Sequence, residues 1–440
     1  MARNIPDSDV RTEHKKQHGL LALSPIIVFL VVYLVSSLLA GDFYKVPVSS
    51  AFLVASVYAV VITPGKLSYR INVFSESAGH WNIMLMVWIF MLAGAFAGSA
   101  KEIGSIEATV NFTLNIIPAR FLLAGLFLTA CFVSLAIGTS VGTIVALVPI
   151  ASGIAEETGL SQAMMAALIV GGSFFGDNLS FISDTTIAAT RAVGCAMSEK
   201  FKANFMIVLP AVIVVAGYYI FKGLSIQTAS VLHPIEWLKL LPYLSVIILA
   251  LFGMDVTLVL VLGLLLNAIV GFSTGSLDWF SWLGSMGQGI ADMGDLIIVT
   301  LLAGGMLGII RYNGGLDFIM RSVVKRAHGR KGAELSIGLL TALANLCTAN
   351  NTIAIITVGS IVNDISDEFD IPKRRAASLM DIFSCFVQGI IPYGAQLLMA
   401  AGLTGLATTQ IIPYLYYPFA VGICVIISIL FSNNSKRPLK

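Results

Sequence analysis

The sequence predicts an all-α polytopic membrane protein with two related halves. Three observations support this prediction: the composition, a series of apolar segments of spanning length, and an internal repeat. The 440 residues are 57% hydrophobic and only 11% charged, whereas soluble domains carry about 25% charged residues. A chain with so few charges needs lipid to cover its apolar surface.

The composition also excludes several classes of protein. The net charge is only +2, and no basic stretch alternates with aromatics, so nucleic acid is not an expected partner. The five cysteines are scattered without metal-site or disulfide spacing. No Walker loop, nucleophile elbow or zinc motif appears, so we expect neither enzymatic activity nor a cofactor.

The first half, residues 20–221, follows a polar tail of residues 1–19 that contains Arg3 and Arg11. A membrane-spanning helix needs roughly 20 apolar residues, and the first apolar run, which lacks a clear cleavage site, is expected to be retained. The predicted segments are spans at 20–40, 47–63 and 82–99, an amphipathic stretch near 103–116, a hairpin at 120–155, an interrupted helix at 161–195 and a span at 203–221.

The second half, residues 237–431, repeats this order before a polar tail of residues 432–440. Its predicted segments are spans at 237–251, 255–272 and 294–311, an amphipathic 315–327, a hairpin at 333–366, an interrupted helix at 375–404 and a last span at 411–431.

A direct alignment supports the repeat. Residues 91–106 match 301–316 without a gap, and the shared positions include Gly94/Gly304 and Gly98/Gly308. Thr143 then aligns with Thr352, and, after a two-residue insertion, Ser173 aligns with Ser384, Asp177 with Gln388 and Thr185 with Gln396. A shared glycine pattern at a nearly constant offset favours gene duplication over chance apolar similarity.

The distribution of lysine and arginine predicts cytoplasmic termini. With the N-terminus inside, the basic clusters at 311–331 and 373–375, together with Arg191, Lys200 and Lys202, all lie inside, and 273–295 lies outside without any Lys or Arg. Corresponding spans then run in opposite directions, so the repeat is expected to be inverted, as in alternating-access carriers.

Each predicted hairpin has a short polar tip. The first contains Thr139, Ser140 and Thr143, and the second contains Asn350, Asn351 and Thr352. The hairpins could cross the membrane fully, but polar tips at corresponding positions favour re-entrant hairpins that end near the midplane.

The candidate cation site lies in residues 171–186, between two apolar helical stretches. Its polar residues are Asp177, Asn178, Ser180, Ser183, Asp184, Thr185 and Thr186. Hard cations prefer such oxygen ligands, and loss of water favours the protonated carboxyl whereas a bound cation favours the carboxylate. The site could therefore exchange Na⁺ for H⁺. Asp184 could instead pair with Arg191, seven residues later.

The second half supplies a smaller set of polar candidates. Asp381 could carry a proton at membrane depth or pair with the basic cluster at 373–375. Gln388, Tyr393 and Gln396, together with Asn350, could contact an ion or an organic solute.

The run Gly176-Asp177-x-x-Ser180-x-x-Ser183-Asp184-Thr185-Thr186 resembles the signature of the NhaC-type Na⁺/H⁺ antiporters. This resemblance implies inverted repeats, re-entrant hairpins, elevator-like motion and a place in the bacterial inner membrane. It favours Na⁺/H⁺ exchange, and leaves Na⁺-coupled transport of malate, lactate or an amino acid as the alternative. The same resemblance implies that the early spans, 20–99 and 237–311, form a scaffold through which two chains associate as a homodimer.

Overall fold

The structure is a computed structural model that describes residues 19–40, 47–181, 183–226, 234–252, 254–324 and 329–432. Every regular element in those ranges is helical. The predicted all-α class is therefore confirmed for the described part of the chain. The predicted polar tails lie almost entirely outside these ranges.

The helices of the first half lie between Gly19 and Gly223. They are α1 (Gly19–Ala40), α2 (Val48–Ile62), α3 (Leu67–Ala78), α4 (Trp81–Glu102), α5 (Ser105–Ile116), η2 (Ala119–Phe121), α6 (Leu122–Ile137), α7 (Ser140–Thr158), α8 (Gln162–Leu179), α9 (Asp184–Val193) and α10 (Met197–Gly223). The last begins six residues before the predicted span, which has consequences for the site.

The helices of the second half repeat the arrangement. They are α11 (Trp237–Leu251), α12 (Val256–Thr274), α13 (Trp279–Asp292), α14 (Gly294–Tyr312), α15 (Gly315–Val324), α16 (Gly329–Thr348), α17 (Asn351–Glu368), α18 (Lys373–Ile390), α19 (Ala395–Thr404), α20 (Thr408–Ile411), η3 (Ile412–Tyr414) and α21 (Tyr416–Leu430).

The helix ends show the repeat more sharply than the residue identities do. An offset of 211 residues relates the end of α6 to that of α16, the start of α7 to that of α17, and both ends of the breaks in α8–α9 and α18–α19. The glycines that precede α5 and α15, Gly104 and Gly314, both have positive φ. Thr143 therefore corresponds to Ala354, and the sequence alignment of the second hairpin was wrong by two residues.

Two helices, α3 and α13, were not predicted, because their sequences are too polar or too short to read as spans. A Cβ at Gly94 or Gly98 of α4 would meet the backbone of α13, and one at Gly305 or Gly308 of α14 would meet side chains of α3. Small residues let helix backbones approach closely in membranes. The glycines of α4 and α14 thus allow each long helix to approach a helix of the other half closely.

Eight helical segments of the described chain are long and apolar enough to cross a membrane, or nine if the bent pair that ends in α21 is one span. The pieces α8–α9 and α18–α19 each count as one segment. Helices α16 and α17 are not among them, unlike α6 and α7, because their faces are partly polar.

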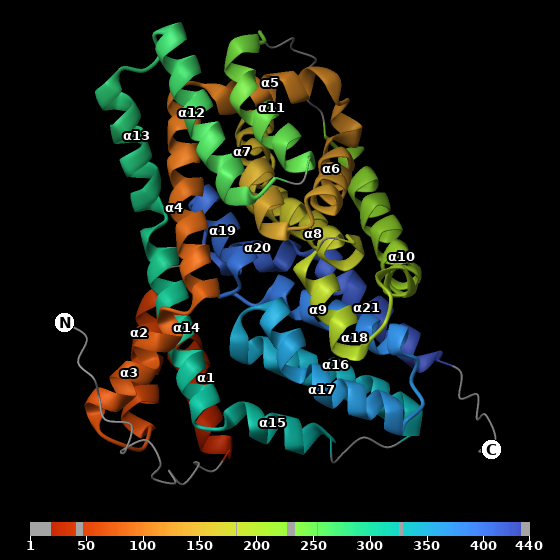
Figure 1. Ribbon diagram of the computed structural model, residues 1–440. Coiled ribbons are helices and arrows are strands. Elements are labelled where there is room, and N and C mark those ends of the chain that lie inside the picture. The colour runs from red at the N-terminus through yellow and green to blue at the C-terminus, as the bar shows by residue number, and fades with distance from the viewer. Residues whose placement is uncertain are drawn as a thin grey trace.

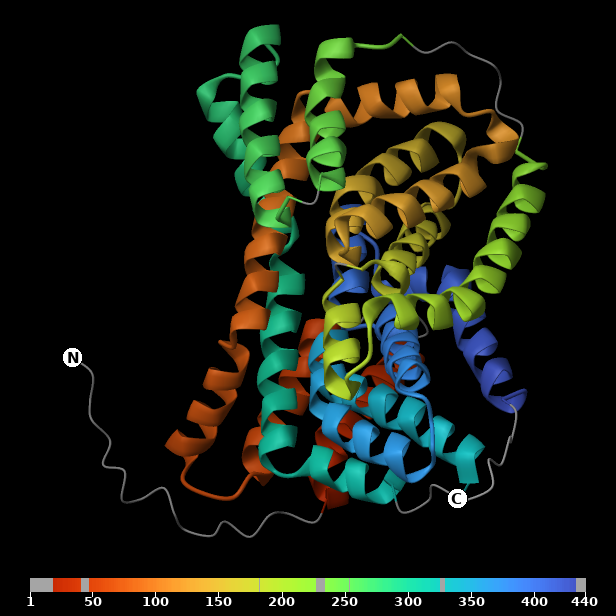
Figure 2. The same cartoon turned by 45° about the vertical axis from the view of Figure 1, so that its right-hand side comes forward.

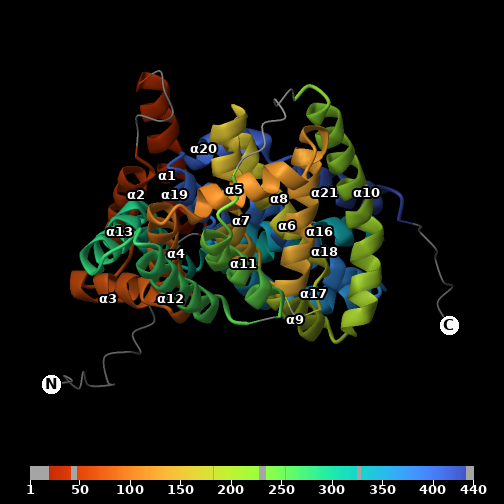
Figure 3. The same cartoon turned by 90° about the horizontal axis from the view of Figure 1, so that it is seen from above.

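The broken helices lie in the middle of the molecule. In Figure 1, α5 crosses the top and α15, α16 and α17 lie across the bottom, with α8, α9, α18 and α19 between them. Figure 2 shows α4 and α14 running lengthwise beside this group. Seen from above, α1 to α4 gather with α12 and α13 at one side, and α10, α16 and α21 lie at the other (Figure 3).

Candidate functional site

The two helix breaks expose backbone carbonyls that the helices cannot satisfy. Ser180 and Ser183 flank the first break in extended conformation, and Pro392, which has no N–H, lies in the second. The last carbonyls of a helix need outside partners. At the end of α8, the carbonyl of Asp177 accepts a hydrogen bond from Thr185 Oγ1 at 2.9 Å. The carbonyl of Asn178 accepts from Lys200 Nζ at 2.8 Å and from Asn204 Nδ2 at 2.7 Å, both on α10.

The carboxylate of Asp177 binds the tip of the first hairpin. Its two oxygens accept from the Ser140 backbone N–H at 3.2 Å and from Ser140 Oγ at 2.6 Å. Ser140 is the first residue of α7, so the carboxylate sits at a helix N-terminus, where the helix dipole favours negative charge. Asp177 is only 4% exposed. The structure therefore joins this aspartate to the tip of the first hairpin.

A chain of hydrogen bonds joins this tip to the second half. Gln396 Nε2 donates to Ser140 Oγ at 2.9 Å. Gln388 Nε2 donates to Gln396 Oε1 at 2.9 Å and to the carbonyl of Ala349, in the tip of the second hairpin, at 3.1 Å. The tips of both hairpins are thus connected through side chains of both broken helices.

Other contacts repeat at equivalent positions. Ser134 Oγ of α6 donates to the carbonyl of Ser173 in α8, and Asn345 Nδ2 of α16 donates to the carbonyl of Ser384 in α18 at 2.7 Å. Each hairpin is therefore tied to the broken helix of its own half by the same type of bond.

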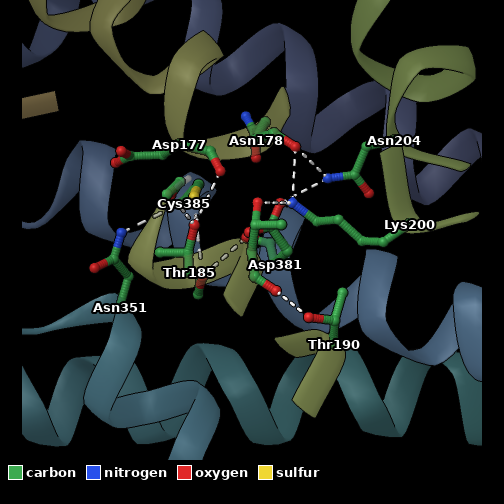
Figure 4. Close-up of polar contacts among 12 residues, drawn as sticks. Asp177, Asn178, Thr185, Thr190, Lys200, Asn204, Asn351, Asp381 and Cys385 are labelled. Carbon is green, nitrogen blue, oxygen red and sulfur yellow. Dashed lines mark hydrogen bonds and ion pairs between the residues drawn. The ribbon is translucent and has the colours of Figure 1, made fainter. Parts of the chain in front are cut away.

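A buried ion pair that the sequence analysis missed lies beside the first break. Lys200 Nζ lies 2.9 Å from Asp381 Oδ2, and the two side chains are 1% and 0% exposed. The same ammonium donates to the carbonyl of Asn178 at 2.8 Å and to Thr186 Oγ1 at 2.7 Å. Asn204 Nδ2 donates to Asp381 Oδ2 at 2.6 Å. Figure 4 shows this cluster next to Asp177, with Thr185 between them.

These contacts correct one interpretation of the sequence. Asp381 does not pair with the basic cluster at 373–375, since it binds Lys200 and Arg375 binds Glu334 at 2.8 Å. Lys200 entered the sequence analysis only as a positive charge of the inner side, and its side chain is buried because α10 begins at Met197. The spacing of Lys200 and Asn204, four residues apart on one helical face, was the available sequence signal.

Asp184 lies apart from this buried cluster. Its side chain is exposed, as is that of Arg191, and no ion pair joins the two within the described ranges. The alternative that Asp184 is a structural partner of Arg191 is therefore wrong. Asp184 is the first residue of α9, and the dipole of that helix stabilises a negative charge at its N-terminus.

The remaining candidates lie in the two tips and the two breaks. Ser180, Ser183, Thr185 and Thr143 are buried, and Ser183 Oγ lies 2.8 Å from Thr185 Oγ1. In the second half, the side chain of Asn350 caps α17 by accepting from the backbone N–H of Ile353. The others there are Asn351, which is buried, Thr352, which is half-buried, and Tyr393, whose hydroxyl donates to the carbonyl of Leu346 at 2.8 Å.

The two buried aspartates have different electrostatic surroundings. Asp381 has the ammonium of Lys200 beside it. Asp177 accepts only from the neutral groups of Ser140, and no cationic side chain of the described chain forms an ion pair with it. A buried carboxylate without a compensating charge is costly, so Asp177 needs a proton or a mobile cation. No cluster of His, Cys, Asp and Glu in the described residues suits a transition metal.

The array of candidate spans and the polar centre between two broken helices define a multi-pass membrane transporter. The model of the Na⁺/H⁺ antiporter family matches residues 17–224 and again residues 226–433. The chain therefore belongs to the Na⁺/H⁺ antiporter family, of the NhaC type, and is a secondary antiporter and not an enzyme. The two successive matches agree with the two halves of the fold.

Three relatives share a quarter or less of their residues with the chain. The malate-2H⁺/Na⁺-lactate antiporter of Bacillus subtilis is 25% identical, covering 93% of this chain and 95% of its own. An uncharacterized Na⁺/H⁺ antiporter of Haemophilus influenzae is 24% identical, covering 92% and 94%. The Na⁺/H⁺ antiporter NhaC of Alkalihalophilus pseudofirmus is 22% identical, covering 76% and 79%.

Proposed function

We propose that the chain exchanges Na⁺ for H⁺ by alternating access, with Asp177 holding the two ions in turn. The observation that carries this proposal is a buried carboxylate without a cationic side chain, placed at a helix break and at a hairpin tip. One negative charge in such a place binds either a proton or a cation, and the competition between them couples the two fluxes.

The repeat supports an alternating-access mechanism. Matching helix ends in the two halves are what an inverted duplication with two re-entrant hairpins would produce. The tips of the hairpins then approach the site from opposite sides of the membrane. The chain Asp177–Ser140–Gln396–Gln388 would break and reform as access changes sides.

The further expectations follow from this arrangement. We place both termini in the cytoplasm and the protein in the cytoplasmic membrane of a bacterium, with the α1–α4 and α11–α14 helices as a scaffold for a homodimer. Twin basic clusters at 311–331 and 373–375 support the orientation.

Na⁺-coupled transport of a small organic solute, either an amino acid or a carboxylate such as malate or lactate, is the second candidate. It is favoured by the malate and lactate named for one relative and by the buried Gln388 Oε1, which accepts no hydrogen bond from the described residues. An organic carboxylate would need a cationic partner. The only Lys, Arg or His that is buried in the described ranges is Lys200, and its positive charge is already paired with the carboxylate of Asp381. Na⁺/H⁺ exchange is therefore the better supported function.

Proteoliposomes separate the two functions. Purified protein is reconstituted with a pH-sensitive dye inside, and a Na⁺ gradient is imposed without any organic solute. Na⁺-driven pH change that is lost in Asp177→Asn supports direct exchange. A pH change that appears only after malate or lactate is added would instead favour the organic antiporter.

A further inference from the structure

The ammonium of Lys200 occupies a small cage of oxygens at the first helix break. Its three acceptors are the Asn178 carbonyl, Thr186 Oγ1 and Asp381 Oδ2, at 2.8, 2.7 and 2.9 Å. A lysine ammonium has three N–H donors, so these three oxygens satisfy it completely. A backbone carbonyl freed by a broken helix, a hydroxyl and a carboxylate are also the ligand types that a hard cation takes.

The amide side chains around this cage have unused acceptors. Asn178 Oδ1 and Asn204 Oδ1 are buried and accept no hydrogen bond from the described residues. Both residues are 0% exposed. Their nitrogen atoms do donate, to Tyr417 and to the Asn178 carbonyl and Asp381 respectively. The second oxygen of the cage carboxylate, Asp381 Oδ1, is likewise buried and accepts no hydrogen bond from the described residues.

The fold itself does not require a polar cluster at this place. With the offset of 211 residues between the broken helices, Asp381 corresponds to Val170 in the first half, and Thr186 corresponds to Leu397 in the second. Val170 and Leu397 are fully buried in the equivalent packing. The same architecture thus exists with apolar side chains, which argues that the charged pair serves more than helix packing.

We propose that the Lys200 ammonium is a tethered cation that fills a second cation site, and that removing this side chain opens the site to Na⁺. The ligands would be the Asn178 carbonyl, Thr186 Oγ1 and Asp381 Oδ2, which now surround the ammonium. This inference extends the proposed function, since it adds a fixed positive charge beside the exchanging site at Asp177.

The test counts Na⁺ bound to purified full-length protein in detergent, by equilibrium binding of radioactive Na⁺, with choline replacing Na⁺ in the reference. Lys200→Ala should bind one more Na⁺ per chain than the wild type. Lys202→Ala is the matched control, because Lys202 lies two residues away on α10 and is exposed. It should bind the same number as the wild type.

Lys200→Ala also leaves Asp381 buried without its partner, which destabilises a protein. Na⁺ should therefore raise the melting temperature of Lys200→Ala by more than it raises that of the wild type, and choline should not. The double variant Lys200→Ala/Asp381→Asn, which buries no unpaired charge, should fold and should lose the extra Na⁺.

An unchanged Na⁺ count in Lys200→Ala would overturn the inference. So would a Lys200→Ala protein that stays unfolded at high Na⁺ while the double variant folds, because the pair would then be purely structural. The test measures the difference in bound Na⁺ per chain between Lys200→Ala and the wild type, so it does not require that the wild type exchanges Na⁺ for H⁺. A wild type without Na⁺-driven proton movement would refute the proposed exchange and leave this result standing.

Discussion

Competition between protons and Na⁺ at Asp177 gives the sharpest prediction. The carboxylate binds Na⁺, whereas the protonated carboxyl does not, so each bound Na⁺ must displace one proton. In the pH range where Asp177 of the Na⁺-free protein is protonated, lowering the pH by one unit should weaken the apparent Na⁺ affinity about tenfold, or about 1.4 kcal/mol. At higher pH, where the proton is already lost, the affinity should become constant.

The structure indicates how Asp177→Asn should behave. The amide oxygen can still accept from the Ser140 N–H, but the amide nitrogen cannot accept from Ser140 Oγ, as Asp177 does at 2.6 Å. Loss of one hydrogen bond to a charged group costs about 1.5–3 kcal/mol, which a folded membrane protein should survive. The variant should therefore fold and bind no Na⁺ at this site.

The assay is calorimetric titration of detergent-solubilised protein with Na⁺ between about pH 5.5 and 8.5, a range wide enough to show a tenfold change per unit. Titration in buffers of different ionisation enthalpy counts the protons released. Glu156→Gln is the control, since Glu156 is an exposed acid near the end of α7. Affinity that stays flat over the whole range, without proton release, would refute competition at Asp177.

Three other substitutions test the packing and the orientation. Gly176→Ala should destabilise the protein by about 1–3 kcal/mol, because the new Cβ would meet the backbone of α6, whereas Gly217→Ala, inside α10 with open space around it, should leave the melting temperature unchanged or slightly higher. Glu334→Gln should lower stability by about 3 kcal/mol, since this fully buried carboxylate balances an arginine of α18; an unchanged melting temperature would show that the arginine finds another partner. A cysteine at Ser276 should react with an impermeant reagent added outside intact cells, and one at Asp370 should not; the opposite labelling would reverse the topology.

The sequence alone was sufficient for the membrane class, the family and the duplication. Apolar segments of spanning length and the Gly94/Gly304 and Gly98/Gly308 pairs are local patterns along the chain. Asp177 could be selected in the same way, because a carboxylate inside an apolar helical stretch has few explanations other than function. The break between Leu179 and Asp184 was also visible as a polar interruption.

Only the tertiary structure decided which polar residues share one site. Asp381 meets Lys200 across 181 residues of chain, and Gln396 meets Ser140 across 256. No periodicity encodes such contacts, because they depend on how the two halves pack against each other. The exposure of Asp184 follows from the same packing, which turns one aspartate of the motif toward the outside and buries Asp177 against a helix N-terminus. Local sequence patterns determined where the helices form, and the packing of one half on the other determined which polar side chains contact each other.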